Sequence, residues 1–543
     1  MAQTKEPLEE RIIRERKLLW EEHRQFEPLW QEIHELVYPR STEITVINSP
    51  GSQRTRKLFD STAVIAATRL AAAMAGVVTP STIQWFDYGL PSLPGVQVPK
   101  VVVDWVQGNA STTFDILQAT NFDTEVQELY HDLVTFGTGA FFIIDDDGIP
   151  MFRTLHPQEY AIWTDSNGRV TKLVRDVQMT VREAIVTFGE ENLAPEIRRE
   201  LEESPTTAPD KLCTFVQWIA NRKDEAMGFP VDNFPVASIY VDLKYKHIVK
   251  KTGFQEWPCP VVRWASSSGE SYGRSPAFDS LPDIASLNKA EELALKAWAM
   301  AVMPPLLARH DGILGTPDLR PARISFVNDE GALNWFPPGT NLDIETVQRD
   351  DKRRAIWNAF FMDQVQFVPE RGKTPPSAEE VRARLNIMLQ ILGPTLSRLE
   401  YELLIPTLDR VFGILSRSGH IQPAPLAVLQ YAERTGKSLN VQFIGPIARA
   451  KRQAESQKLD IMLATVGNAM AVDPNAMDVL DIDEWVREKA KVEMVPRNLI
   501  RDRAKVKEIR DGRAQAEAEA REAEQMRTGS EAVRNVTPLL QGK

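Results

Sequence analysis

One long stretch with a helical apolar repeat, residues 377–419, constrains the fold of this chain more than any other feature. Ser377 and Glu380 form an S-x-x-E capping box at its start, and Gly419 stands where a helix would end in a left-handed residue. Apolar residues recur mainly at steps of three and four, the spacing of one helix face: Val381, Leu385, Met388, Leu392, Leu396, Leu399, Leu403, Val411 and Leu415. The pattern predicts a helical rod of roughly 60 Å at about 1.5 Å per residue.

Prolines interrupt this rod twice. Gly393-Pro394 and Pro406 each remove an internal hydrogen bond, so we expect one or two kinks. A helix of this length does not suit a single small globular domain. It suits an elongated subunit that packs side by side with copies of itself.

Composition and charge narrow the class of protein. With 543 residues, 43% hydrophobic and 26% charged, the chain is long enough for several folded domains. Its net charge of −11 argues against a surface that grips nucleic acid, but allows a passage through which nucleic acid slides. No apolar run approaches 18 residues, and Cys213 and Cys259 carry no metal-binding spacing. We therefore expect a soluble protein, cytoplasmic while it is made, with reduced thiols.

Residues 1–265 predict an α+β domain. Helical patterns cover 5–38, 60–78 and most of 99–137. Strand patterns follow, and the turn sequences at 145–148 and 166–168 indicate two β-hairpins. After the second hairpin, the sequence up to residue 265 predicts a helical segment over 180–205 and further strands.

The rest of the chain is mainly helical. Pro276 begins a helix that runs to Pro304, and Ser275 is its expected cap. A Pro/Gly-rich segment follows, and then Asp343 is expected to cap a helix over 343–365. After the loop 366–376 and the rod, residues 420–475 predict short helices and turns. The chain is helical again from 476, with the last 15 residues loose. The expected fold class is α+β, mainly α.

The sequence contains almost no catalytic signature. It has no phosphate-binding glycine loop, no H-E-x-x-H and no G-x-S-x-G, and its seven histidines are scattered. Asp145, Asp146 and Asp147, followed by Gly148, are the one acidic cluster that could bind a divalent ion. Asp and Gly also suit a hairpin turn, and we favour that interpretation. We expect no catalytic residue, no metal and no cofactor.

Two groups of polar and charged residues are the remaining candidate sites. A basic run in the helix 343–365 has acids beside it and predicts a solvated face or ion pairs between subunits: Arg349, Lys352, Arg353 and Arg354. The loop 366–376 is either a connector or, in a ring of copies, a set of groups near a phosphate backbone: Gln366, Glu370, Arg371 and Lys373.

Four blocks of the sequence resemble the portal, or head-to-tail connector, proteins of short-tailed, podovirus-type bacteriophages. They are residues 74–90, 157–180 and 271–306, and the rod together with the LNVQFIGPIARAKR block at 439–452. The similarity covers about residues 50–510 in the same order. The N-terminal helix and the C-terminal tail carry less of it.

The resemblance implies an elongated subunit in a ring of twelve with a DNA-sized channel. Its parts would be a wing (1–265), stem helices (266–303 and 343–365), a clip (304–342), a tunnel loop (366–376), a kinked wing helix (377–419), a crown (420–495) and a C-terminal barrel helix with a loose tail (496–543). The loop residues would face DNA and the basic run would form stem ion pairs. Clip residues would dock the tail adaptor: Arg309, His310, Arg320 and Arg323.

The implied function is a structural channel at one capsid vertex, through which the genome is packaged and ejected. The implied partners are double-stranded DNA, major capsid and scaffolding proteins, a terminase motor and a tail adaptor, with no membrane. The protein would be assembled in the host bacterial cytoplasm and reside in the virion. Two other interpretations stay open: a non-channel adaptor or scaffold of the virion, and a metal-dependent packaging nuclease that uses Asp145–Asp147.

Overall fold

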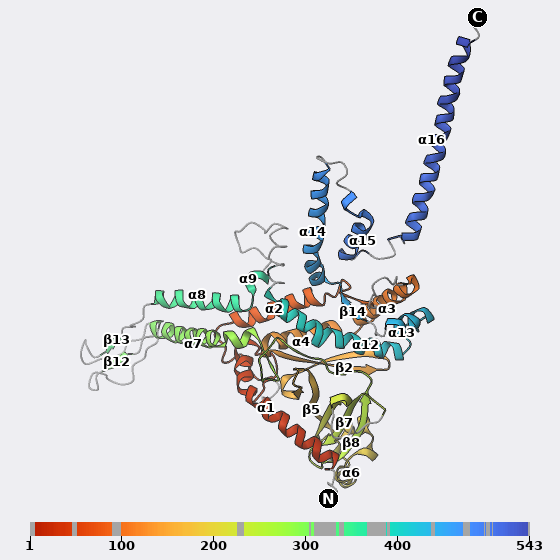
Figure 1. Cartoon of the computed structure of the whole chain (residues 1–543). Helices are drawn as coiled ribbons and strands as arrows, with labels where there is room; N and C mark the ends of the chain where they lie inside the picture. The colour runs from red at the N-terminus through yellow and green to blue at the C-terminus, as the bar shows by residue number, and fades with distance from the viewer. Residues whose placement is uncertain are drawn as a thin grey trace. The chain divides into compact units, whose positions relative to one another are not determined.

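The computed structural model divides the chain into two units, Met1–Gly445 and Pro446–Lys543, which we describe separately. The structure describes residues 6–45, 51–89, 99–224, 233–302, 306–308, 333–335, 342–365, 387, 391–435, 440–470, 478–493, 495, 500–501 and 503–540. Figure 1 labels the elements of both units.

Four helices begin the first unit, as the sequence predicts: α1 (Leu8–Val37), α2 (Thr62–Val78), α3 (Lys100–Ala119) and α4 (Phe122–Phe136). The predicted apolar face of α1 is buried from Ile12 to Val37. Helix α2 packs against α4, and its alanines Ala63, Ala66 and Ala67 are buried. Their small side chains allow close approach of the two helices.

Two antiparallel sheets follow α4. The first has the order β3-β2-β9, with strands β2 (Thr138–Asp146), β3 (Ile149–Leu155) and β9 (Val261–Arg263). The second has the order β4-β5-β6-β7-β8, with strands β4 (Tyr160–Thr164), β5 (Val170–Thr180), β6 (Leu212–Asn221), β7 (Val236–Asp242) and β8 (Ile248–Phe254). Both predicted hairpins are therefore present.

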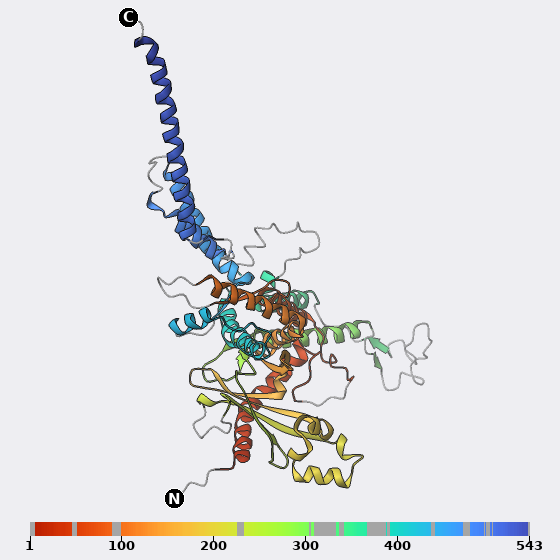
Figure 2. The ribbon, with the colours of Figure 1, turned by 90° about the vertical axis from the view of Figure 1, so that its right-hand side faces the viewer.

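The five-stranded sheet is covered on both faces. Trp20 and Leu19 of α1 pack on one face, in a cluster that includes Trp218 and Ile239. Phe215 lies in the cluster on the other face, beneath α5 (Val181–Phe188) and α6 (Pro195–Glu203). Figure 2 shows the strands between α1 and these two helices. Short 3₁₀ turns complete this region: η1 (Pro157–Glu159), η2 (Glu190–Asn192), η3 (Ala208–Asp210) and η4 (Arg222–Asp224).

Helix α7 (Pro276–Val302) starts where expected, but the Ser275 hydroxyl donates to the Thr135 carbonyl (2.7 Å) and so ties the helix start to the end of α4. The helix expected over 343–365 is broken. Helix α8 spans Leu342–Ala359, and a short α9 spans Met362–Val365. Phe361 has φ +58° and stacks on Trp264 (ring centroids 6.4 Å apart), a tertiary contact that overrides the helical pattern.

Of the rod, the structure describes Ile387 and the stretch from Ile391 onward, so the capping box of Ser377 and Glu380 lies outside the described residues. This stretch consists of α11 (Gly393–Leu399), a π-helical turn η5 (Glu400–Leu404) and α12 (Ile405–Arg417). Pro394 and Pro406 lie in the first turns of α11 and α12. Gly419 has φ +80°, as predicted.

Strand β14 (Asn440–Phe443) pairs with β1 (Phe86–Gly89) and closes the first unit. Before it, α13 (Leu426–Thr435) packs on α3. Two more two-stranded sheets pair β10 (Ala265–Ser266) with β11 (Gly273–Arg274), and β12 (Leu306–Ala308) with β13 (Leu333–Trp335).

The second unit contains α14 (Pro446–Ala469), α15 (Ile482–Val492) and α16 (Arg503–Leu540). Two expectations were wrong here. Residues 446–469 form one long helix, because Pro446 suits a first turn and strong helix formers such as Ala, Lys, Gln and Leu follow. The last residues were expected to be loose, but α16 continues to Leu540, since extending an established alanine- and glutamate-rich helix costs little.

Candidate functional site

Only one of the three predicted groups of site residues can be located in the structure. The loop residues Gln366, Glu370, Arg371 and Lys373 lie outside the described residues, and so do Arg309, His310, Arg320 and Arg323. The basic run lies on α8, and α7 and α8 lie side by side (Figure 1).

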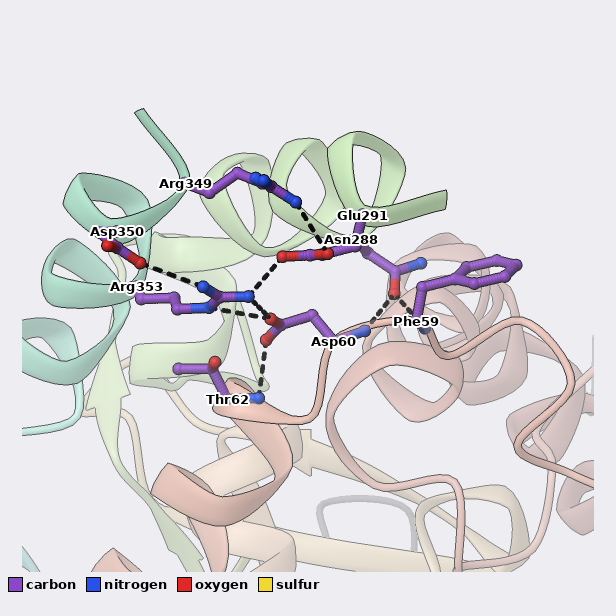
Figure 3. A network of polar contacts seen from close by, with 8 residues as sticks. All are labelled: Phe59, Asp60, Thr62, Asn288, Glu291, Arg349, Asp350 and Arg353. Atoms are coloured by element: carbon purple, nitrogen blue, oxygen red, sulfur yellow. Dashed lines mark hydrogen bonds and ion pairs between the residues drawn. The ribbon is translucent and has the colours of Figure 1, made fainter. Parts of the chain in front are cut away.

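Arg353 is the centre of an ion-pair cluster that joins three segments (Figure 3). Its Nε and Nη2 atoms donate to Oδ2 of Asp60, at 3.1 and 3.0 Å. Nη2 also donates to Glu291 of α7, and Nη1 donates to Asp350 of α8 at 3.1 Å. Arg349 adds a second guanidinium to Glu291, with Nη1 3.1 Å from Oε2. Arg353 and Glu291 therefore hold the two helices together.

Asn288 of α7 fixes the chain that leads into α2. Its side-chain oxygen accepts from the backbone N–H groups of Phe59 (2.7 Å) and Asp60 (3.2 Å), and its side-chain nitrogen donates to the carbonyl of Lys57 (2.9 Å). Oδ1 of Asp60 accepts from the backbone N–H of Thr62 (2.8 Å) and so satisfies a free donor at the start of α2. The cluster thus links α2, α7 and α8 (Figure 3).

The electrostatics of the cluster favour the charged form of Arg353. Asp60 and Glu291 have 9% and 16% of their side chains exposed, and each faces Arg353. Partial burial opposes the charge of Arg353, but the hydrogen bond and charge of Asp60, followed by Asp350 and Glu291, raise the pKa of Arg353. Removing one partner would leave a poorly solvated charge.

The two remaining residues of the basic run are bound more loosely. Lys352 donates to the Ser286 hydroxyl at 2.6 Å and lies 3.5 Å from Asp283. Arg354 lies 3.9 Å from Asp351, and both side chains are largely exposed, at 78% and 66%. Such an exposed pair contributes little stability.

Sequence reasoning found the basic run and its local acids but missed its stronger partners. Asp60 and Glu291 are 293 and 62 positions from Arg353 along the chain, with no motif that relates them. Only the packing of α8 on α7 and α2 brings them together.

Helix α7 also exposes large apolar side chains. Leu293, Leu295 and Trp298 have 54%, 51% and 65% of their surface exposed. Trp298 follows Leu295 by one helical turn, so the two share a face. Exposed residues of this size mark a surface that a partner can cover.

The acidic cluster at 145–147 lies at a hairpin turn, as we favoured: Asp145 and Asp146 end β2, and Asp147 is in the turn. Asp147 and Gly148 both have positive φ, +48° and +85°, and Oδ1 of Asp145 accepts from the backbone N–H of Gly148 (3.0 Å). Within the described ranges, no three His, Cys, Asp or Glu side chains are grouped to hold a metal ion. None of the helices in the described part of the chain combines the length and apolar character needed to cross a membrane.

Comparison with known proteins gives one family match and two similar relatives. The family model described as bacteriophage head to tail connecting protein matches residues 9–500. A probable portal protein of Bordetella phage BPP-1 is 26% identical over 513 residues, covering 92% of this chain and 90% of the relative. A portal protein of Salmonella phage epsilon15 is 24% identical, covering 99% and 96%.

Among solved structures, a chain from the neck of an empty gene transfer agent particle is similar over 78% of this chain and 93% of its own length. The two sequences are 14% identical, and the TM-score is 0.34.

Proposed function

The chain belongs to the family of bacteriophage head to tail connecting proteins, and from this premise we propose that copies of it form a closed ring around a DNA channel. It is a portal protein, a part of the virion that joins head to tail. The observation that carries this conclusion is the family match over residues 9–500, which spans nearly the whole chain.

The ring we propose has twelve subunits, with α7 and α8 as the stem that surrounds the channel. The exposed Leu295 and Trp298 of α7 support this arrangement, because a neighbouring copy would remove them from water. The ion pairs of Arg353 and Glu291 would keep each helix pair rigid within the ring.

The remaining assignments follow the same proposal. Residues 366–376 would form the tunnel loop and 304–342 the clip, while 1–265 and 377–419 would form the wing. Residues 420–495 would be the crown and 496–543 the C-terminal barrel segment.

The partners of such a ring would be double-stranded DNA, major capsid and scaffolding proteins, a terminase motor and a tail adaptor. A separate motor would supply the energy of packaging, and assembly would take place in the host cytoplasm. The net charge of −11 suits a channel that does not grip DNA.

The native mass of the purified full chain tests the ring. Twelve copies of the 61.2 kDa chain amount to about 730 kDa, with cyclic symmetry visible in micrographs. A monomer or dimer that cannot be driven to a ring would contradict the proposal and favour an adaptor or scaffold. The nuclease alternative is tested by replacing Asp145, Asp146 and Asp147 with Asn. Full packaging activity in this triple variant would rule out a nuclease site at these residues.

Two variants test the assignments within the ring. Replacing Arg371 and Lys373 with Ala should leave rings intact but impair packaging or retention of DNA, since these cations would lie nearest the phosphates. Deleting 304–342 should abolish adaptor binding. Unchanged packaging in the double Ala variant would refute the assignment of the tunnel loop. Intact adaptor binding after the deletion would refute the assignment of the clip.

A further inference from the structure

The edges of the two larger sheets differ in how they are protected. Along β3, the side chains of Asn121 and Glu125 accept from the outward backbone N–H groups of Phe152 (3.0 Å) and Thr154 (2.7 Å). Asn121 also donates to the Phe152 carbonyl at 2.7 Å. This edge is closed to any further strand.

Two other edges are closed in the same way. On β9, a carboxylate oxygen of Glu402 accepts from the backbone N–H of Arg263 at 3.0 Å. On β4, the hydroxyl of Tyr272 accepts from the backbone N–H of Ile162 at 3.3 Å. In each case one side chain from another segment takes the place that a neighbouring strand would occupy.

Strand β8 is the remaining edge, and it is open. It pairs only with β7. Antiparallel pairing leaves every second residue's N–H and C=O pointing away from the partner. Within the part of the chain that the structure describes, those outward groups of β8 bond to no other segment. Val249 is an extra residue in the ladder, and from Lys250 to Phe254 the pairing with β7 is regular.

This edge is strongly basic in an acidic chain. Lys250 and Lys251 on β8, and Lys244 and Lys246 in the turn that precedes it, are all exposed, whereas the whole chain carries −11. Lys244 donates to the hydroxyl of Tyr245 at 2.7 Å. The other three lysines form no ion pair with the described residues. Their charge is therefore available to a partner.

The lysines stand on both faces of the sheet. Lys250 lies opposite Tyr240, which packs in the cluster beneath α5 and α6. Lys251 lies opposite Ile239, which belongs to the cluster beneath α1. Side chains directly opposite each other on neighbouring strands share a face, so a strand added beside β8 would meet one lysine on each face.

We propose that the open edge of β8 binds an extended acidic segment of a partner protein, which adds to the sheet as a sixth strand. Main-chain hydrogen bonds to Lys250–Phe254 supply affinity, and carboxylates opposite the two lysines supply selectivity. A second copy of β8 is excluded, because it would place lysine near lysine. Nucleic acid is disfavoured, because it makes no use of the free backbone groups.

The test measures fluorescence anisotropy of a labelled peptide titrated with the full-length protein. The peptide consists of two Val-Glu-Glu-Val repeats, because adjacent Glu residues place a carboxylate on each face of an added strand. The expected result is saturable binding at the edge. The same peptide with all of its backbone nitrogens methylated keeps its charge but has no N–H group on either edge, so it cannot pair as a strand and should not bind. Hydrogen exchange should slow at the outward amides of β8 when the unmethylated peptide is present.

Two variants locate the site. Lys250→Glu with Lys251→Glu should weaken peptide binding about tenfold or more, because two favourable cross-strand charge pairs become repulsive. Lys17→Glu, at an exposed position on α1, is the control and should leave binding unchanged. Lys250→Gln with Lys251→Gln should give an intermediate loss. Unchanged circular dichroism shows that the variants are folded.

Three outcomes would overturn the proposal. One is the absence of saturable binding, and another is equal binding of the methylated peptide, which would reduce the site to charge attraction. The third is equal competition by a 20-base-pair DNA duplex, which would make the lysines a phosphate-binding surface. None of these outcomes depends on whether the protein forms a ring.

Discussion

At the scale of single residues, the strength of an ion pair in this protein follows from its surroundings more than from its sequence spacing. Arg353 and Arg354 are neighbours, and each pairs with an acid three positions earlier. Only Arg353 also reaches Asp60 and Glu291, which are mostly buried. The charge pattern of the sequence alone would predict the same contribution to stability from both arginines.

Replacing Asp60 with Ala should therefore destabilise the first unit by about 1–2 kcal/mol, because a hydrogen bond to a charged group and a donor partner at the start of α2 are both lost. The effect stays below that of a fully buried pair, since Arg353 is 37% exposed. Urea denaturation of the full chain measures it. Arg354→Ala is the matched control and should change stability by less than about 0.5 kcal/mol. Equal effects of the two substitutions would contradict this account.

Buried histidines give the stability a predictable pH dependence. Burial, together with nearby cations or a second histidine, lowers the pKa of His34, His131 and His156 to about 4. An unfolded chain binds these protons at the ordinary value near 6.5. Between pH 6.5 and 4 the unfolded state therefore holds more protons, so stability is full above 6.5 and is lost as the pH falls toward 4.

Thermal unfolding at pH 7.5 and 5 measures this dependence, with a lower melting temperature expected at pH 5. His131 stacks on Tyr38, with ring centroids 3.9 Å apart. In the variant His131→Phe the stacking survives but the titration is lost, so the difference between the two pH values should shrink. A difference that stays the same would show that His131 does not contribute.

At the scale of elements, the sequence predicted the helices and hairpins that depend on local chemistry. The turns at 145–148 and 166–168 were found because Asp, Asn and Gly suit positive φ. The break at Phe360 and Phe361 was missed because phenylalanine continues the apolar pattern, and the contact with Trp264 that holds it is remote in sequence. The π turn of η5 was also missed, although Pro406 marks its position.

Pro406 explains why the rod contains a π turn. It cannot donate to the carbonyl four residues earlier, and its ring would crowd that carbonyl. The backbone N–H of Ile405 instead reaches back five residues, to Glu400. Within this turn, Glu402 accepts from Nη2 of Arg263 (2.6 Å) and from its backbone N–H (3.0 Å). The rod is thereby fixed to the edge of β9.

Removing the carboxylate of Glu402 should cost about 3 kcal/mol, because Arg263, with 6% of its side chain exposed, would keep its charge without an adequate partner. The substitution Glu402→Ala can be compared with Tyr401→Ala, whose side chain in the same turn is 64% exposed. Chemical denaturation should show a large loss for the first and little change for the second. Similar values for both would mean that the Glu402–Arg263 pair does not fix the rod.

At the scale of the whole molecule, the sequence predicted the fold class through the resemblance and the order of elements, but not the extent of the units. The predicted boundary at residue 265 does not separate compact parts, because the first unit continues to Gly445. Strand β14 and the rod return to pack on elements near the N-terminus, and such contacts leave no local pattern.

The exposed face of α7 gives a prediction about assembly. Introducing Glu at Leu295 and Trp298 should prevent ring formation, because burying two carboxylates at an apolar interface costs several kcal/mol per subunit. Native mass measurement should then show mainly monomers. Val186→Glu is the control, since Val186 is 85% exposed but lies on α5, and should still form rings. Rings formed by the double variant would place the interface elsewhere.

The pairing of β1 with β14 also governs when the first unit can be completed during synthesis. Phe86 pairs with Phe443, so about 360 further residues must be synthesised before β1 finds its partner. At about 5–20 residues per second, this delay is roughly 20 to 70 s. A chain that terminates before β14 leaves β1 unpaired, so its first unit is incomplete. Because an unpaired strand edge favours aggregation, we expect such incomplete copies to aggregate or be degraded before they join an assembly.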